Sequence, residues 1–390
     1  MAKKTKKHKL SPTLASAMDE VTKQFGAGAV ILAAEGEALD IPRIRTGIFS
    51  IDYVSGGGIP RGKIIILDGE ASGGKSSTAL QIVVSFQSHC RNCGDPIYET
   101  TEAGKYRCSC KKAPEPMRVL WYDAEGIWAN TWADEHGVDL ELIHVIRTEA
   151  AEDGLDICRH LLGTGEFDLF VLDSIAHLTP TKELEDSMGK VQPGGQARLV
   201  NRALREFVAK QTKDGGKGAP TIVLINQIRY KIGVMFGDPR TRPGGVGMDF
   251  ASSLDLRFKK AKKFYLDVEC NPVAPTKAKD SGYPPAYVEV SFNCTKNRVF
   301  AAGLNGGYQL YVSNGPVNPK TGQPAWSKGT ISDFDWVWSM AQKENLVERD
   351  GKNWRCGKLT ASSKPDLKTA LQGSAEDQES LKDALLSILL

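Results

Sequence analysis

Residues Gly69-Glu70-Ala71-Ser72-Gly73-Gly74-Lys75-Ser76 decide the fold of this 390-residue chain. They fit the phosphate-loop pattern of a glycine, four residues, Gly-Lys and a serine or threonine, and they follow an apolar run, 64–67, that predicts a buried strand. A helix is expected to begin near Lys75, so that its positive end and the loop N–H groups face a phosphate. Lys75 is predicted to reach the β and γ phosphates, and Ser76 to hold Mg²⁺. A glycine-rich surface turn is the alternative, but it does not explain the strand before the loop or the apolar run after it.

Two further apolar runs end in carboxylates. Residues 118–122 lead into Glu125, and residues 167–172 lead into Asp173. The carboxyl ends of parallel strands face the crevice where open α/β sheets bind ligands. Glu125 is therefore a candidate base that orients a water, and Asp173 a candidate partner of Mg²⁺. Each pattern is also common in solvated turns, so both assignments depend on the phosphate loop.

Strands that alternate with helical stretches predict an α/β fold with a mostly parallel central sheet. A third run, 220–225, ends at Asn226-Gln227 and brings polar groups to the same crevice. Two loops leave this edge, at 185–195 and 228–247. The second alternates basic residues with apolar ones, a pattern that suits nucleic-acid contact. A lid over the nucleotide explains that loop equally well.

Charge and composition limit the classes of protein. The chain carries 50 Lys and Arg against 47 Asp and Glu, and a net charge of +3 is too small to identify a nucleic-acid binder. Basic residues cluster locally at 3–9, 229–242 and 259–263, although the first cluster is better explained as a solvated tail. No run reaches the length of a membrane span, and the start lacks the apolar segment of a signal peptide. We expect a cytoplasmic protein without membrane contact.

Four of the eight cysteines lie within 21 residues, at Cys90, Cys93, Cys108 and Cys110. Two closely spaced pairs that flank a hairpin-like stretch predict a structural four-thiolate Zn²⁺ site, since all four ligands come from the protein. The alternatives are a redox pair and unligated thiols. The predicted site lies in a segment, 88–117, between the phosphate-loop helix and the Glu125 strand.

The densest motifs are Thr22-Lys23-Gln24-Phe25-Gly26, residues 172–180 and residues 225–237. With these motifs the chain resembles the bacterial and phage RecA-type DNA recombinases over roughly residues 10–310, with one interruption. The resemblance implies a DNA-dependent ATPase that forms filaments on single-stranded DNA and exchanges strands with a homologous duplex. Further copies of the chain would be partners, together with a single-strand-binding protein or a loader.

The family's functional residues can be carried over by position. The resemblance implies catalytic roles for Glu125, Lys75, Gln227, Lys296 and Arg298. It implies ATP contacts for Gly69, Glu70, Ala71, Ser72, Gly73, Gly74, Lys75, Ser76, Ser77, Trp132 and Asp173, with Mg²⁺ at Ser76 and Asp173. It implies DNA contacts for Arg198, Arg205, Arg229, Lys231, Ile232, Met235, Phe236, Gly244 and Gly245.

Four roles within these sets are specific. Glu125 matches the catalytic base and Gln227 the γ-phosphate sensor, while Trp132 matches the aromatic residue that stacks on adenine. Lys296 and Arg298 match two lysines that reach ATP from the neighbouring subunit, and arginine at the second position changes the donor geometry.

The resemblance also divides the chain. It implies a polymerisation arm (1–40), a RecA-like ATPase core (41–312) that contains the insert, and a small α+β C-terminal domain (313–390). The sequence departs from the family at Ala129, where an aspartate usually reads adenine, and at the C-terminus, which is not acidic. A helicase-like motor and an ATP-binding protective coat for single strands are the rival functions. The complete set of Lys75, Glu125, Asp173 and Gln227 disfavours the coat.

Overall fold

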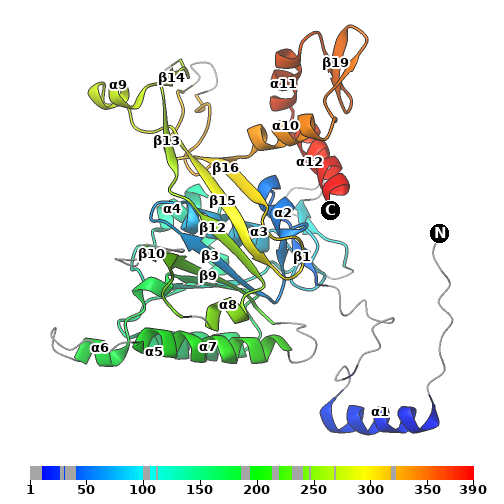
Figure 1. Ribbon diagram of the computed structural model, residues 1–390, viewed down its shortest axis with the longest axis vertical. Helices are drawn as coiled ribbons and strands as arrows, with labels where there is room; N and C mark the ends of the chain where they lie inside the picture. Colours follow the sequence, from blue (N-terminus) through cyan, green and yellow to red (C-terminus); the bar gives the residue numbers. More distant parts are fainter. Residues whose placement is uncertain are drawn as a thin grey trace.

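The computed structural model describes residues 11–26, 30, 41–99, 106–110, 113–185, 194–212, 219–230, 240–245, 247–267, 269–317 and 322–390 (Figure 1). The helices are α1 (Pro12–Phe25), α2 (Phe49–Ser55), α3 (Lys75–Gln87), α4 (Asn130–Glu135), η3 (Leu140–Leu142), α5 (Ala151–Gly163), η4 (Ile175–His177), α6 (Thr181–Glu185), α7 (Gly195–Thr212), α8 (Gly247–Ala251), α9 (Pro275–Asp280), α10 (Phe334–Lys343), α11 (Lys364–Gln372) and α12 (Ala375–Leu389).

The strands of the central sheet are β3 (Ile64–Gly69), β6 (Val119–Asp123), β7 (Ile143–Ile146), β8 (Leu169–Asp173), β9 (Thr221–Gln227), β12 (Leu254–Phe258), β13 (Lys262–Leu266), β14 (Pro272–Val273), β15 (Tyr287–Asn297), β16 (Asn305–Tyr311) and β17 (Ile331–Ser332). The smaller sheets contain β1 (Arg43–Ile44), β2 (Ile59–Pro60), β4 (Tyr98–Glu99), β5 (Tyr106–Arg107), β10 (Arg229–Tyr230), β11 (Arg240–Thr241), β18 (Glu348–Asp350), β19 (Asn353–Cys356) and β20 (Leu359–Ala361).

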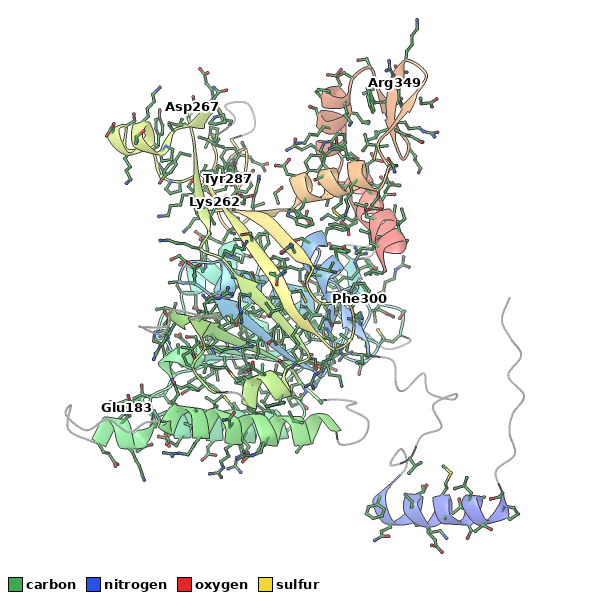
Figure 2. All side chains as sticks on the ribbon, in the orientation of Figure 1. Glu183, Lys262, Asp267, Tyr287, Phe300 and Arg349 are labelled. Atoms are coloured by element: carbon green, nitrogen blue, oxygen red, sulfur yellow. The ribbon has the colours of Figure 1, made fainter. Side chains whose placement is uncertain are left out.

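The central sheet has 11 strands, and its main path runs β14-β13-β15-β12-β3-β9-β8-β6-β7. The strands from β12 to β7 are parallel, which confirms the predicted α/β class. Beyond β12 the sheet continues in antiparallel strands, because β15 pairs with β12, β13 and β16. The sequence analysis did not predict this extension. Figure 2 shows Lys262 and Asp267 on the part of it that projects from the body of the protein.

Helices cover both faces of the parallel strands, as alternating side chains require. On β3, Ile65 and Leu67 lie in one hydrophobic cluster with the apolar side of α3, including Phe86. Ile64 and Ile66 lie in a second cluster that contains residues of α5 and α7. Because the six residues of β3 are all buried, the strand that leads into the phosphate loop is held from both sides.

The N-terminal helix α1 lies away from the sheet (Figure 1). Its start has Pro12 in the first turn, and the Ser11 hydroxyl accepts from the Leu14 N–H group at 3.3 Å. None of its residues is buried, and Phe25 is 67% exposed. An amphipathic helix with its apolar face exposed requires a partner surface for stability. The apolar run 29–33, whose sequence predicts a strand, lies outside the described residues except for Val30.

The C-terminal unit has its own hydrophobic cluster, built from α10, α11, α12 and the sheet β18–β19–β20. Strands β18 and β19 form a hairpin with Asp350-Gly351 at its turn, and Gly351 has a φ of 61°. Arg349 lies on this hairpin, at the outer end of the unit (Figure 2). Phe49 of α2 belongs to the same cluster, so the unit packs directly against the part of the chain that contains the central sheet.

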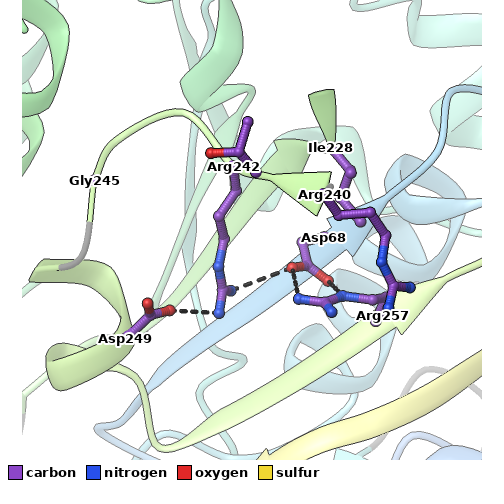
Figure 3. Close-up of a pocket in the computed structure, with 8 residues that line it drawn as sticks. Asp68, Ile228, Arg240, Arg242, Gly245, Asp249 and Arg257 are labelled. Atoms are coloured by element: carbon purple, nitrogen blue, oxygen red, sulfur yellow. Dashed lines mark hydrogen bonds and ion pairs between the residues drawn. The ribbon is translucent and has the colours of Figure 1, made fainter. Parts of the chain in front are cut away.

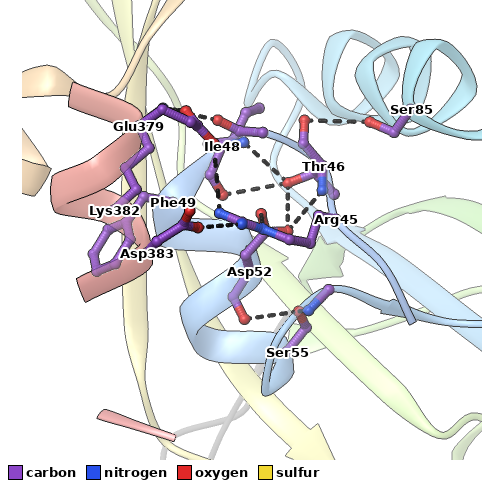
Figure 4. A network of polar contacts seen from close by, with 12 residues as sticks. Arg45, Thr46, Ile48, Phe49, Asp52, Ser55, Ser85, Glu379, Lys382 and Asp383 are labelled. Atoms are coloured by element: carbon purple, nitrogen blue, oxygen red, sulfur yellow. Dashed lines mark hydrogen bonds and ion pairs between the residues drawn. The ribbon is translucent and has the colours of Figure 1, made fainter. Parts of the chain in front are cut away.

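A polar network completes this contact (Figure 4). Lys382 of α12 binds Asp333 at 3.0 Å and the Gly47 carbonyl at 2.9 Å. Arg45 forms ion pairs with Asp383 of α12 and with the fully buried Asp52 of α2, 3.7 Å away. Burial raises the pKa of Asp52 to about 6, although hydrogen bonds from Thr46 and the charge of Arg45 oppose the shift.

Asp52 therefore makes the stability of the fold depend on pH. The folded protein keeps the Asp52 proton up to a pKa of about 6, whereas the unfolded chain releases it near 3.8, so this group's contribution to stability falls as pH rises between these values. We expect Asp52→Asn to gain about 2 kcal/mol relative to wild type between about pH 4.5 and 7.5. Urea unfolding of both proteins at the two pH values measures this difference. A difference that does not change with pH would contradict the burial of an ionisable Asp52.

Candidate nucleotide site and nucleic-acid interface

The phosphate loop has the predicted strand, loop and helix. β3 ends at Gly69 and α3 begins at Lys75, with Gly74 in the left-handed region at a φ of 89°. A Cβ atom on Gly74 would lie 2.7 Å from the Val290 Cγ2 atom on β15. This position therefore needs glycine for both its backbone angle and its contact with the neighbouring strand.

Lys75 is folded over this loop. Its Nζ atom donates to the Glu70 carbonyl at 2.6 Å and to the Gly69 carbonyl at 3.3 Å. Burial lowers the pKa of Lys75, while the carboxylates of Asp173 and Glu125 oppose the shift. A buried cation beside two carboxylates and a glycine-rich helix start is suited to bind a phosphate and its metal ion.

Asp173 and Ser76 provide oxygen atoms where Mg²⁺ was predicted. Asp173 is 3% exposed, and its Oδ1 atom has no hydrogen-bond partner among the described residues. Burial raises the pKa of Asp173 to about 6, a hydrogen bond from Ser76 opposes the shift, and Glu125 and Asp123 add to it. A carboxylate with an unpartnered oxygen next to a hydroxyl fits the oxygen ligands that Mg²⁺ prefers.

Glu125 is held close to Asp173 through the backbone. The N–H groups of Ala124 and Glu125 both donate to the Asp173 carbonyl, at 2.8 and 3.2 Å. The Glu125 Oε2 atom lies 3.6 Å from the Nδ1 atom of His177, and that nitrogen lies 2.9 Å from the Ser174 hydroxyl. The structure thus brings the predicted base, the predicted Mg²⁺ carboxylate and the loop lysine together at one end of the sheet.

The sequence analysis did not recognise the role of Asp123. This buried carboxylate accepts from the N–H groups of Ile127 and Trp128, both at 3.0 Å, and binds Arg147 Nε at 2.8 Å. It therefore fixes the turn that carries Glu125. A strand-end aspartate followed by a glycine-containing turn is the sequence signal that indicates such a cap.

Trp132 lies on α4, and Lys328 lies over its ring, a contact that was not expected from the sequence. Lys328 Nζ is 5.1 Å from the centre of the Trp132 ring and 2.9 Å from the Glu135 carboxylate. The ring of His136 meets Trp132 edge-on, with 4.3 Å between the ring centres. Trp132, the predicted adenine-stacking residue, thus contacts a segment almost 200 residues further along the chain.

Gln227 lies beside the phosphate loop. In the parallel pair of β3 and β9 its Cα atom is the register partner of Gly69. The next residue, Ile228, donates its N–H group to the Gly69 carbonyl at 3.1 Å. The chain then forms the antiparallel pair β10–β11, in which Arg229 faces Thr241 and Tyr230 faces Arg240. The second predicted DNA loop therefore starts from a short hairpin stem at the nucleotide site.

The other predicted DNA contacts separate into two groups. Arg198 and Arg205 are exposed and lie on one side of α7, seven residues apart. Gly244 has a φ of 93°, and a Cβ atom there would lie 2.9 Å from the Met248 sulfur. Gly245 also has a positive φ, of 71°. The remaining predicted contacts lie outside the described residues: Lys231, Ile232, Met235 and Phe236.

Lys296 and Arg298 do not contact the phosphate loop of their own subunit. Lys296 Nζ donates to the Asp249 carbonyl, and to the Ser252 carbonyl at 2.6 Å. Arg298 donates to the Phe250 carbonyl at 2.8 Å. In the sheet Lys296 lies opposite Asp255 of β12, and Asp255 lies opposite Ile66 of β3, three residues before the phosphate loop.

The four predicted zinc ligands come together. Their sulfur atoms all lie within 4.8 Å of one another, with Cys108 and Cys110 at 2.9 Å and Cys90 and Cys110 at 3.8 Å. Burial would raise the pKa of Cys90, but backbone N–H groups lower it to about 6, whereas the hydrogen bond with Cys110 raises the pKa of Cys108. These four cysteines could hold a tetrahedral metal ion.

The cysteine cluster lies at the sheet edge opposite the phosphate loop. Cys90 lies three residues beyond the C-terminal end of α3. Between Cys90 and Cys93, Arg91 binds the Gly165 carbonyl at 2.7 Å and Glu166 at 3.1 Å, just before the start of β8. The insert is therefore attached to the amino ends of the parallel strands.

The fold and the site define a phosphate-loop ATPase with a parallel core. The profile of the RecA N-terminal domain family matches residues 12–95 and 99–278. Protein RecA of Mannheimia haemolytica is 30% identical over 376 residues, 94% of this chain and 92% of that protein. Protein RecA of Clostridium novyi (strain NT) is 36% identical over 248 residues, 63% of this chain and 62% of its own length. Protein RecA of Francisella tularensis subsp. novicida (strain U112) is 29% identical over 382 residues, 97% and 89% of the two chains.

The chain belongs to the RecA family. It is an ATP-dependent recombinase, and its family's activity is DNA-dependent ATP hydrolysis coupled to strand exchange. Family membership implies ATP and Mg²⁺ as cofactors, DNA as a ligand and polymerisation of the chain. In the part of the chain that the structure describes, none of the helices has the length and apolar character needed to span a membrane.

Proposed function

We propose that this recombinase hydrolyses ATP at a site shared between two neighbouring subunits of a filament. One subunit supplies the phosphate loop with Lys75, and the next supplies Lys296 and Arg298. The observation that supports this proposal is the position of the two cations, which bind carbonyl groups at the end of α8 and, among the described contacts, none of the phosphate loop of their own chain. Since transition-state charge on a phosphoryl group needs cations close by, a neighbouring chain must bring them.

Each residue of the site has a separate task in this proposal. Ser76 and Asp173 hold Mg²⁺, which neutralises phosphate charge when it is bound. Glu125 orients the attacking water and accepts its proton, and Lys75 stabilises the phosphoryl oxygens. The N–H groups from Gly69 to Ser77 hold the phosphates. Trp132 stacks on the base, and Ala129 leaves adenine without an acidic partner.

DNA binds at the carboxyl ends of the same strands. Arg198 and Arg205 contact the phosphates of single-stranded DNA from α7, and Arg229 does so from the hairpin stem. Gln227, two residues before this loop's stem and beside Gly69, detects the γ-phosphate and passes its state to the loop. Base pairing between the two DNA molecules reads homology, so backbone contacts are sufficient for the protein.

The remaining parts of the chain have accessory roles in this proposal. Helix α1 belongs to a polymerisation arm, residues 1–40, that packs on a neighbouring core and covers the exposed Phe25. Residues 41–312 form the ATPase core and residues 313–390 a separate small domain. The protein acts in the cytoplasm on single-stranded DNA, where a single-strand-binding protein or a loader is a further partner.

A mixing experiment tests the shared site. We expect Lys296→Ala and Glu125→Ala each to abolish DNA-stimulated ATP hydrolysis. In equal mixtures about one quarter of the interfaces combine the intact halves of both variants, so activity should return to about that fraction. A mixture of Glu125→Ala and Asp173→Asn is the control, because both residues lie in the same half-site and no interface is intact. Lack of recovery in the first mixture would contradict the shared site.

We also propose that Cys90, Cys93, Cys108 and Cys110 bind one structural Zn²⁺ ion. The purified protein should contain about one zinc per chain by elemental analysis, and Cys110→Ser should lose it. Cys270→Ser, at an exposed cysteine outside the cluster, is the control and should keep it. Removal of the metal should lower the melting temperature but spare ATP affinity, because the cluster and the phosphate loop lie at opposite ends of α3. Loss of ATP binding on zinc removal would contradict a separate structural module.

A further inference from the structure

Beside the phosphate loop lies a compact cluster of charged side chains that ATP hydrolysis and DNA binding do not account for (Figure 3). Its centre is Asp68, the fully buried residue directly before Gly69. Arg257 of β12 holds the Asp68 carboxylate with two bonds, 3.2 Å from Nε and 3.0 Å from Nη2. Arg242 reaches the same carboxylate from the opposite side, at 3.3 Å.

Arg242 connects three carboxylates from three elements. Besides Asp68 on β3, it binds Asp255 of β12 at 3.2 Å and Asp249 of α8. Its side chain is 18% exposed, although it lies among the basic residues that the sequence analysis considered for DNA contact. A guanidinium group can hold several carboxylates at once through its five N–H donors, and an ammonium group cannot hold them in the same planar arrangement.

The position of Arg242 in the chain connects this cluster to the 228–247 loop. It directly follows β11, the second strand of the hairpin stem of the 228–247 loop. The first strand of that stem is preceded by Ile228, whose N–H group binds the Gly69 carbonyl at 3.1 Å. The two sides of the loop are therefore attached to two consecutive residues, Asp68 and Gly69, at the start of the phosphate loop.

The same cluster continues toward the predicted inter-subunit cations. Asp255, which is 2% exposed in its side chain, lies within the electrostatic range of both Arg242 and Lys296. Lys296 binds the Ser252 carbonyl at 2.6 Å, and Ser252 follows α8 directly. A displacement of Arg242 would therefore change the surroundings of Lys296 as well as those of Asp68.

We propose that Arg242 is a positioning residue that makes the placement of the 228–247 loop depend on the nucleotide. The inference rests on the proposed function, in which this loop binds DNA and Gly69 begins the ATP site. Gln227 is bonded through the backbone to the first strand of the loop's stem. Arg242, directly after the second strand, binds Asp68, so a movement of the phosphate loop acts on both strands of the stem. Because Asp68 is buried and Arg242 nearly so, breaking their contact leaves charge without a full set of partners.

Arg257 provides the matched control. It binds the same Asp68 carboxylate and has a similar exposure, 23% against 18% for Arg242. However, Arg257 lies within β12 and is not part of the 228–247 segment. Loss of Arg257 should therefore disturb the folding stability of this region without separating the loop from the nucleotide site.

The test is the affinity of the full-length protein for a fluorescently labelled oligo(dT) strand, measured with a non-hydrolysable ATP analogue and with ADP. We expect wild type to bind at least about tenfold more tightly with the analogue, and Arg242→Gln to reduce this ratio to about threefold or less. Arg242→Lys keeps the charge but loses the forked geometry, so it should give an intermediate ratio. Arg257→Gln should keep the wild-type ratio even where it lowers the melting temperature.

Asp68→Asn distinguishes a specific link from a general defect. If Arg242 acts through Asp68, the double variant Asp68→Asn with Arg242→Gln should have the same ratio as Arg242→Gln alone. A wild-type ratio in Arg242→Gln, or an equal loss in Arg257→Gln, would overturn the inference while the DNA loop itself remains supported. If wild type shows no nucleotide-dependent binding of the strand, both the loop assignment and this inference are wrong.

Discussion

The parallel pairing of β3 with β9 and with β12 is the constraint on which the other parts of the site depend. It fixes Gly69 beside Gln227 and places Arg257 beside Asp68. Gly74 lets the phosphate loop turn tightly over the end of β3, and only a hydrogen atom fits at this position against Val290. The parallel sheet also places β6 and β8 beside β9, so that Glu125 and Asp173 lie at the same edge as the phosphate loop.

Several charged side chains are buried at this edge of the sheet, and each lies beside groups of opposite charge. Lys75 lies close to Asp173 and Glu125, while Asp68 is enclosed by Arg242 and Arg257. The two clusters adjoin through the Asp68-Gly69 peptide. A ligand that draws Lys75 toward its phosphates acts on the same short segment that holds the stem of the 228–247 loop. In the proposed function, nucleotide and DNA are therefore connected over a few residues, without a long path through the core.

The sequence was sufficient for features that depend on local pattern. The apolar runs that end in Glu125, Asp173 and Gln227 predicted parallel strands with polar ends, and the close thiol pairs predicted the Cys90 cluster. Contacts between distant segments could not be predicted in this way. Arg257 and Asp68 are 189 residues apart, and Lys328 and Glu135 are 193 apart. The antiparallel extension from β13 to β17 was missed for the same reason, because alternation does not indicate which strand a segment will pair with.

In the proposed function, this chain hydrolyses ATP as a filament bound to DNA. The most direct measurement is the rate of ATP hydrolysis with and without single-stranded DNA, on a sample examined by electron microscopy at the same time. We expect DNA to stimulate hydrolysis strongly and the same sample to contain helical filaments whenever nucleotide and DNA are both present. Closed rings, or hydrolysis at the same rate without DNA, would contradict it and favour a motor.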